Sequence, residues 1–197
     1  MPNHITNKLR LEGSPENIKK VWDYIKGEEE GQYIDFRKIA TPPNYIFMGG
    51  LDLDMAEIFK SNKKESGFMT ETDSWASWCV RYWGTKWNAY GLDKSRNTEN
   101  TIYFQTAWSG IPRIVALLSE QFPNVDFFYS YADEDFASNT GFLNIFSRDR
   151  LNEYVVLDDK SKEAFDLAAE LIGAESKYGK YIWDEEKQTI YYIDYEE

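Results

Sequence analysis

The strongest constraint on the fold of this chain is a strand-helix-strand pattern that occurs twice. In residues 4–12, apolar and polar side chains alternate, which predicts a strand with one face in the core. Residues 14–27 begin with Ser-Pro, carry apolar side chains at helical spacing and end with glycine, so they predict a helix. The sequence QYIDFRKI, residues 32–39, predicts a strand after that helix. Together these segments form a first unit.

The second unit lies near the middle of the chain. TIYFQTAW (residues 101–108) predicts a strand, IPRIVALLSEQF (111–122) a helix, and VDFFYSYA (125–132) another strand. Two such units in one chain predict an α+β protein with the split βαβ, or ferredoxin-like, arrangement, in which both helices lie on one face of an antiparallel sheet. We expect residues 4–12 and 101–107 to be its two central strands.

The rest of the chain predicts additions to this core within one compact domain, residues 1–197. The ferredoxin-like core is expected at residues 3–39 and 101–147, with a helical insertion at 40–100. A C-terminal extension is expected at 148–197.

Shorter patterns predict the elements of these additions. In the insertion, DMAEIFKSN (54–62) and the tryptophan-rich residues 75–82 have helical spacing, and TKWNAY (85–90) predicts a strand after Gly84. NKKESGFMTET (62–72) predicts a polar loop. The sequence TGFLNIF (140–146) predicts a further strand of the sheet, residues 160–173 a helix, and residues 180–195 a terminal hairpin.

The net charge of −12 is unevenly distributed along the chain. Residues 1–98 hold 14 basic and 14 acidic side chains, whereas residues 99–197 hold 8 and 20. An acidic half opposes binding to a phosphate backbone, which needs clustered cations, but it suits a basic protein partner. The alternative is that the acidic surface serves solubility alone.

Several features indicate a soluble, cytoplasmic protein. No apolar run approaches the roughly 20 residues needed to cross a membrane, and the N-terminus alternates polar and apolar residues instead of offering a signal-peptide block. The single cysteine, Cys79, cannot form an internal disulfide, and the sequence has no Asn-x-Ser/Thr glycosylation acceptor. We therefore expect a reducing compartment and no membrane partner.

Several motifs occur in an order that resembles a known family. They are PNHITNKLRLEG, WGTKWNAY, TAWS, LSEQFP and YADED, between residues 2 and 147. The chain resembles uncharacterised phage- and plasmid-borne bacterial proteins with a ferredoxin-like domain, although Tyr82 and the SGIP sequence depart from the family pattern. The resemblance implies this fold and a gene carried by bacteria or mobile elements. It implies no catalytic residues and no iron–sulfur cluster, which one cysteine could not hold.

The aromatic stretch YWGTKWNAY, residues 82–90, allows two interpretations. Trp83, Trp87 and Trp108 could line an aromatic binding pocket with Lys86 at its mouth. Alternatively, and favoured by their spacing, the rings belong to the core. Lys86 is expected to point away from Trp87 and to pair with carboxylates of the acidic half. Four tryptophans are predicted to be mostly buried: Trp22, Trp75, Trp78 and Trp87.

Metal sites and catalytic sites lack the residues that they need. DEDFASNTG, which begins at Asp133, resembles a calcium loop but fails at its required glycine and glutamate positions, so it predicts a solvated turn. His4 is the only histidine, which leaves zinc binding and histidine-based catalysis with little support. We expect no cofactor and no metal.

An exposed sheet face could bind RNA by stacking bases on aromatic rings. Either Tyr103 and Gln105 or Phe104 and Thr106 would supply that face. The required Lys/Arg-Gly-Phe run is absent and the charge is unfavourable. We expect the C-terminal hairpin or the insertion to cover this face, and we expect no nucleic-acid partner.

These observations favour a non-enzymatic interaction module of bacterial or mobile-element origin. Its acidic half, including Asp133, Glu134 and Asp135, would contact a basic protein or mimic the charge of nucleic acid. The alternative is a small-molecule or single-stranded nucleic-acid binder that uses a tryptophan-lined pocket. An enzyme of unknown class is the third possibility.

Overall fold

The computed structural model of the chain describes residues 2–29, 31–43, 46, 74–91, 93–147 and 151–195. The helix expected at 54–62 and the polar loop expected at 62–72 lie outside these residues. Within them, no helix combines the length and apolar character that crossing a membrane requires.

The main sheet has five strands and is antiparallel throughout. In spatial order the strands are β2 (Thr101–Ala107), β1 (His4–Glu12), β3 (Asp126–Asp133), β4 (Gly141–Phe146) and β5 (Leu151–Val156). The connection from β2 through α5 (Pro112–Gln121) to β3 leaves room for β1 between the two strands. This split βαβ arrangement confirms the predicted α+β, ferredoxin-like fold.

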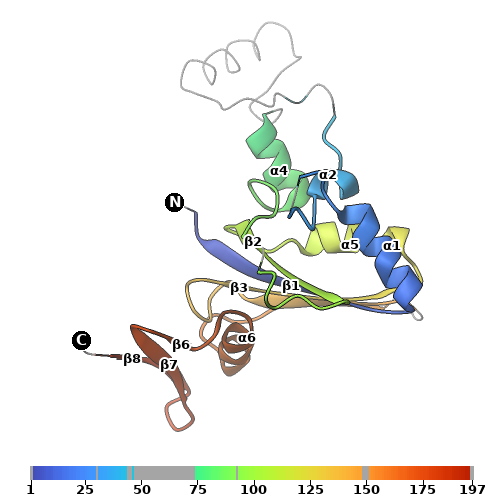
Figure 1. Cartoon of the computed structure of the whole chain (residues 1–197). Coiled ribbons are helices and arrows are strands. Elements are labelled where there is room, and N and C mark those ends of the chain that lie inside the picture. The colour runs from blue at the N-terminus through green and yellow to red at the C-terminus, as the bar shows by residue number, and fades with distance from the viewer. Residues whose placement is uncertain are drawn as a thin grey trace, which may run out of the picture.

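Helices cover the two faces of the sheet unequally. Figure 1 shows α1 (Pro15–Ile25), α4 (Trp75–Trp83) and α5 on one side and α6 (Lys162–Ile172) on the other. The inward face of β1 is buried at alternate residues, as its sequence predicts. The expected placement of the α1 and α5 helices on one face is therefore confirmed, and the opposite face is covered in part by α6.

The strand predicted at residues 32–39 is wrong, because this segment ends in a short helix, α2 (Phe36–Ile39). The Asp35 side chain accepts a hydrogen bond from the backbone N–H of Arg37 and caps this helix. The outer edge of β2 pairs with no strand among the described residues, and a single antiparallel bridge joins Gln105 of β2 to Tyr90. The strand expected at 85–90 is reduced to this bridge, since residues 84–87 form bends. The prediction of two central strands is correct for residues 4–12, since β1 lies between β2 and β3, and wrong for residues 101–107, since β2 ends the order of the sheet.

The C-terminal extension forms a second, three-stranded sheet. Its strands are β6 (Glu175–Ser176), β7 (Gly179–Asp184) and β8 (Thr189–Asp194), in that order. The hairpin of β7 and β8 confirms the hairpin predicted from the sequence. Tyr181 of β7 stacks on Phe136 with a ring-centroid distance of 4.2 Å, and this contact joins the second sheet to the cluster around α6.

The prediction that four tryptophans are mostly buried is correct for Trp78, which is 5% exposed. Trp22, Trp75 and Trp87 keep some exposed surface, but more than half of each residue is buried, and Trp22 and Trp75 pack against the core. Trp22 lies near the surface because its indole N–H reaches the carbonyl of Glu99, an exposed residue.

Candidate interaction surface

Four of the predicted binding residues meet at the end of the sheet where β1 begins and where β2 and β3 end. These are Lys86, Trp87, Trp108 and Glu134. Trp87 lies 6.3 Å from Trp108 and 6.4 Å from Tyr90 between ring centroids, and Tyr90 meets His4 edge-on at 5.6 Å. The rings of His4, Tyr90, Trp87 and Trp108 are named the aromatic ladder.

Lys86 lies against the aromatic ladder, so the predicted outward direction is wrong. Its ammonium nitrogen is 5.1 Å from the Trp87 ring centroid and 4.9 Å from that of Trp108, within the range of cation–π attraction. The bends at residues 84–87 remove the strand alternation that would have separated Lys86 from Trp87. None of the ion pairs among the described residues includes Lys86.

Trp108 is exposed and has an unusual backbone conformation. Its side chain is 46% exposed and its φ is +66°, in the left-handed region that costs energy for residues other than glycine. Two hydrogen bonds of 3.0 Å hold this conformation, from the Trp108 N–H to the Asn3 carbonyl and from Asn139 Nδ2 to the Trp108 carbonyl. The surrounding structure therefore holds a large aromatic ring toward solvent.

Asp133 is a structural residue, since it is only 5% exposed. Its Oδ1 accepts hydrogen bonds from Asn3 Nδ2 at 3.0 Å and from the Asp135 N–H at 2.9 Å. Its Oδ2 accepts one from Asn139 Nδ2 at 3.1 Å. The expectation that Asp133 offers a surface charge is therefore wrong, because its carboxylate closes the turn after β3.

The two following acidic residues remain on the surface. Glu134 is exposed, and its Oε1 accepts a hydrogen bond from the backbone N–H of His4 at 3.0 Å. Asp135 is exposed and lies 3.3 Å from the ammonium nitrogen of Lys160. Exposed pairs of this kind contribute little to stability. The Glu134 carboxylate lies beside the aromatic ladder, because it binds the backbone of His4, whose ring belongs to the ladder.

Trp83 lies away from this surface, so the structure does not form the three-tryptophan pocket. Its ring is 0% exposed and meets Trp75, Trp78 and Phe36 edge-on. Its indole N–H donates a 2.9 Å hydrogen bond to the Ala40 carbonyl. Trp83 is therefore a core residue, as the favoured interpretation of its spacing predicts.

A cavity of 380 Å³ adjoins the aromatic ladder between the sheet and the C-terminal end of α6. Its lining includes His4, Tyr103, Glu134 and Arg96. The Arg96 guanidinium already has partners within the chain, because it lies 3.9 Å from the Tyr103 ring centroid and donates hydrogen bonds to the carbonyls of Glu170 and Leu171 near the end of α6. The aromatic face predicted for RNA stacking is thus covered near Tyr103 by Arg96 and α6.

Tyr90 joins His4 to β2 through its hydroxyl. Tyr90 Oη lies 2.8 Å from His4 Nδ1 and 3.2 Å from the Thr106 carbonyl, so one phenol oxygen bridges the two strands. Burial raises the pKa of the Tyr90 phenol, and the nearby Glu134 carboxylate adds to this effect. Tyr90 therefore remains a neutral link between His4 and β2.

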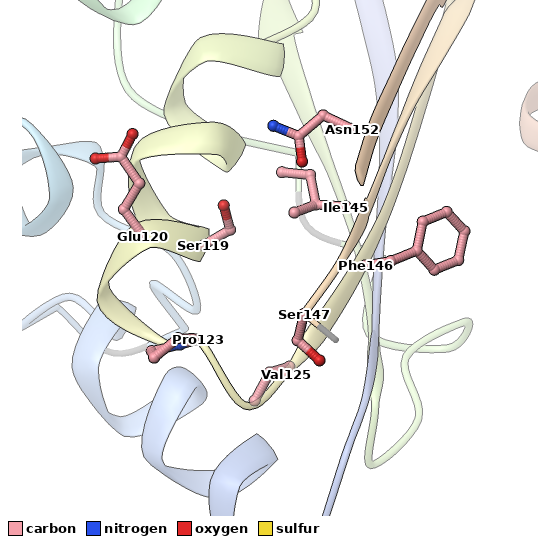
Figure 2. Close-up of a pocket in the computed structure, with 8 residues that line it drawn as sticks. All are labelled: Ser119, Glu120, Pro123, Val125, Ile145, Phe146, Ser147 and Asn152. Carbon is pink, nitrogen blue, oxygen red and sulfur yellow. The ribbon is translucent and has the colours of Figure 1, made fainter. Parts of the chain in front are cut away.

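A second cavity, of 330 Å³, lies between α5 and the strands β4 and β5 (Figure 2). Ile145 and Asn152 point toward α5, whereas Phe146 points to the other side of the sheet. Ser119 and Glu120 approach the cavity from α5. The sequence gives no sign of this cavity, because its walls come from segments that meet only in the folded sheet. Glu120 is the one charged residue among the described residues that line it, so these residues provide no pair of acid and base.

Metal binding and a reactive thiol both lack support among the described residues. No group of three or more His, Cys, Asp or Glu side chains among them could hold a metal ion. Cys79 is 0% exposed, and burial raises the pKa of its thiol to about 12, so it is protonated and unreactive near neutral pH. The arrangement at the aromatic ladder suits recognition of a cation through ring faces and carboxylates.

Comparison with known families gave a match over residues 83–194 to the model described as a ferredoxin-like domain in Api92-like protein. The match includes β2 to β8 together with Lys86, Trp87 and Trp108, and it leaves β1 and α1 outside. No curated protein and no solved structure matches the chain. Because the family model covers more than half of the chain, the protein belongs to the family of ferredoxin-like domains in Api92-like proteins.

Proposed function

We propose that this protein is a non-enzymatic interaction module that binds a basic protein partner. One observation carries the proposal: the ammonium of Lys86 lies 5.1 and 4.9 Å from the ring centroids of Trp87 and Trp108. The ladder thus already binds a basic side chain of its own chain. A lysine or arginine of a partner would be recognised by the same chemistry on the exposed part of Trp108.

The surroundings of Trp108 support binding of a cation. Stacking of a cation on an aromatic ring contributes about 0.5–1 kcal/mol at exposed sites and more once water is excluded. Asp159 Oδ1 accepts a hydrogen bond from the backbone N–H of Asn139, the residue that also holds Trp108. Glu134, which accepts a hydrogen bond from the backbone N–H of His4, is a second carboxylate bound to a segment of this surface. Tryptophan is frequent among the residues that dominate protein interfaces.

The small-molecule and single-stranded nucleic-acid alternative has weaker support. Trp83 is in the core, and Lys86 occupies the space between the two remaining tryptophans. The acidic side chains of residues 99–197 would also repel phosphates. The resemblance to phage- and plasmid-borne proteins supports a bacterial or mobile-element origin and action in the cytoplasm, and the genes that flank this one provide the test of that origin.

Affinity capture from a bacterial lysate tests the binding function. Trp108→Ala should reduce capture of the basic partner about tenfold or more, since truncating a central interface tryptophan typically costs about 2 kcal/mol or more. Val80→Ala is the matched control, because Val80 is a 53% exposed apolar residue on α4. Glu134→Lys with Asp135→Lys should also reduce capture, since both carboxylates are exposed, and Asp133 is left intact because it is buried.

Salt concentration provides an independent measurement. Exposed charges are screened beyond about 8 Å at physiological ionic strength, so capture should weaken as salt rises. The proposed function would be contradicted if wild type, Trp108→Ala and the double reversal all captured the same proteins to the same extent, and if salt did not change that capture.

A further inference from the structure

The outer edge of β8 is open in the second sheet. Within the part of the chain that the structure describes, β7 pairs with one side of β8 and no strand pairs with the other. An unpaired edge presents a row of N–H and C=O groups that can add another strand. Proteins usually protect such edges with proline, charged side chains or bulges. The sequence TIYYI at the start of β8 contains none of the protective residues.

The register shows which backbone groups of β8 face outward. The Tyr195 N–H donates to the Tyr178 carbonyl at 2.9 Å, and hydrogen-bonded pairs alternate along an antiparallel ladder. Counted from the hydrogen-bonded pair of Tyr178 and Tyr195, the pair of Tyr181 and Tyr192 is a non-hydrogen-bonded pair, so their backbone groups point away from each other. Tyr181 accordingly donates its N–H away from β8, to the Ala174 carbonyl at 2.7 Å. The N–H and C=O of Tyr192, with those of Ile190 and Asp194, therefore point to the free edge.

The side chains of β8 provide apolar contacts on both faces of the strand. Tyr191 and Ile193 are 39% and 44% exposed and share one face, and Tyr192, on the other face, is 48% exposed. Side chains of an added strand would pack against them as cross-strand pairs, which stabilise a sheet by about 0.2–1 kcal/mol each in general. The strand is thus suited to pairing through backbone and side chains together.

The charges around β8 favour a basic partner over a second copy. Asp184, Glu185 and Glu186 precede the strand and Asp194 ends it. The Lys187 ammonium lies 5.1 Å from the Tyr191 ring centroid, which shows that a tyrosine of this strand accepts a cation. A second copy would bring the same carboxylates into the interface, where the negative charges of the two copies would repel each other.

We propose that the free edge of β8 binds an extended basic segment of the partner as an added β-strand. This inference rests on the proposed function and names the conformation and the chemistry of the segment that is bound. The bound strand alternates basic residues, which meet the carboxylates and tyrosine faces, with apolar residues.

A pair of variants at Tyr192 tests the backbone contact. Tyr192→Pro and Tyr192→Val both remove the phenol ring, but only proline removes the outward N–H. The probe is a short peptide of alternating lysine and valine, with binding measured by calorimetry. We expect Tyr192→Val to bind within a few-fold of wild type and Tyr192→Pro to bind about tenfold more weakly, as expected for loss of a backbone hydrogen bond and of strand geometry.

A modified probe keeps the test decisive if the proline variant does not fold. The same peptide, N-methylated at two adjacent central residues, keeps its charge but loses one N–H on each of its edges. Wild-type protein should bind the methylated peptide about tenfold more weakly. Equal binding of the two peptides would overturn the inference, because charge alone would then explain binding.

Two further outcomes separate this inference from the proposed function. Failure to bind the alternating peptide, with salt-dependent and Trp108-dependent capture of a basic protein intact, would overturn strand addition and leave the proposed function standing. A dimer that grows with protein concentration and disappears in Tyr192→Pro would make a second copy the occupant of the edge and overturn the inference.

Discussion

The substitution Tyr129→Phe should destabilise the fold strongly, although it removes a single oxygen atom. Tyr129 is 1% exposed, and its hydroxyl donates to Asn7 Oδ1 and accepts from the Ile111 N–H, both at 2.6 Å. Burial holds the pKa of this phenol well above its ordinary value, so the hydroxyl stays neutral and keeps both bonds. These bonds join β1, β3 and the start of α5.

The magnitude follows from the two partners that are left behind. Asn7 is 0% exposed, and the Ile111 N–H has no other partner among the described contacts. A buried polar group that loses its partner costs about 1–3 kcal/mol, so two such groups predict a loss of about 2–6 kcal/mol. Ile111 lies three positions after Trp108 in the sequence. Loss of its hydrogen bond should therefore loosen the backbone near Trp108 and weaken binding of the partner there.

Urea unfolding monitored by tryptophan fluorescence measures this loss. Tyr24→Phe is the control, since Tyr24 is 36% exposed and its hydroxyl donates to the Lys38 carbonyl at 2.6 Å. Water can replace that bond, so the control should lose about 1 kcal/mol or less. A Tyr129→Phe variant within about 0.5 kcal/mol of wild type would refute the reasoning, because the buried partners would then have found others.

Three other predictions concern single side chains. Trp83→Ala should lower the free energy of unfolding by about 3–5 kcal/mol in urea titrations, whereas Trp108→Ala should change it by less than about 1 kcal/mol, since only Trp83 is buried; equal losses would contradict the burial. Cys79, with its thiol pKa raised to about 12 by burial, should react with a thiol-specific chromogenic reagent at neutral pH only after unfolding, and rapid labelling of the native protein would be inconsistent with this. Burial alone would raise the pKa of Asp35, but hydrogen bonds from Arg37 and Asn88 outweigh it and leave the pKa lowered. The resulting stabilisation is present above the unfolded pKa of about 3.9 and is lost as pH falls through the folded value, so melting temperatures of Asp35→Asn should depend less on pH in the acid range than those of wild type; parallel curves would count against it.

Elements with local signals were predictable from the sequence. Ser14 accepts a hydrogen bond from the Asn17 N–H at the start of α1, as its Ser-Pro start suggests. The alternation in β1 also survives in the fold, with Asn7 as the polar exception on the buried face. The segment around Asp35 was mispredicted because a short apolar run fits a strand or a helical turn equally well. The Asn88 side chain favours the helical turn over a strand, because it accepts a hydrogen bond from the Phe36 N–H and donates one to Asp35. Asn88 is distant from both residues in the sequence, so no local pattern could reveal this contact.

The candidate surface was predictable in residue types but not in arrangement. Trp87 and Lys86 are neighbours in sequence, and only the bends at 84–87 bring the lysine onto the ring. The left-handed backbone of Trp108 could not be predicted from the sequence. Glycine or asparagine is the residue type that indicates such a conformation, and this position holds a tryptophan. Asp133 is buried through Asn3, which is 130 positions away, and no local pattern distinguishes it from the exposed Glu134.

The position of β1 between β2 and β3 sets the order in which this protein can fold during synthesis. β1 leaves the ribosome before its partners, Thr101–Ala107 and Asp126–Asp133, and the Asn7–Tyr129 hydrogen bond spans 122 positions. Chains dominated by such distant pairings fold slowly, because a long loop must close before its contacts form. Until residue 133 has been made, β1 lacks β3, the strand that pairs with its other edge, and a nascent chain in that state is a substrate for chaperones and a risk for aggregation.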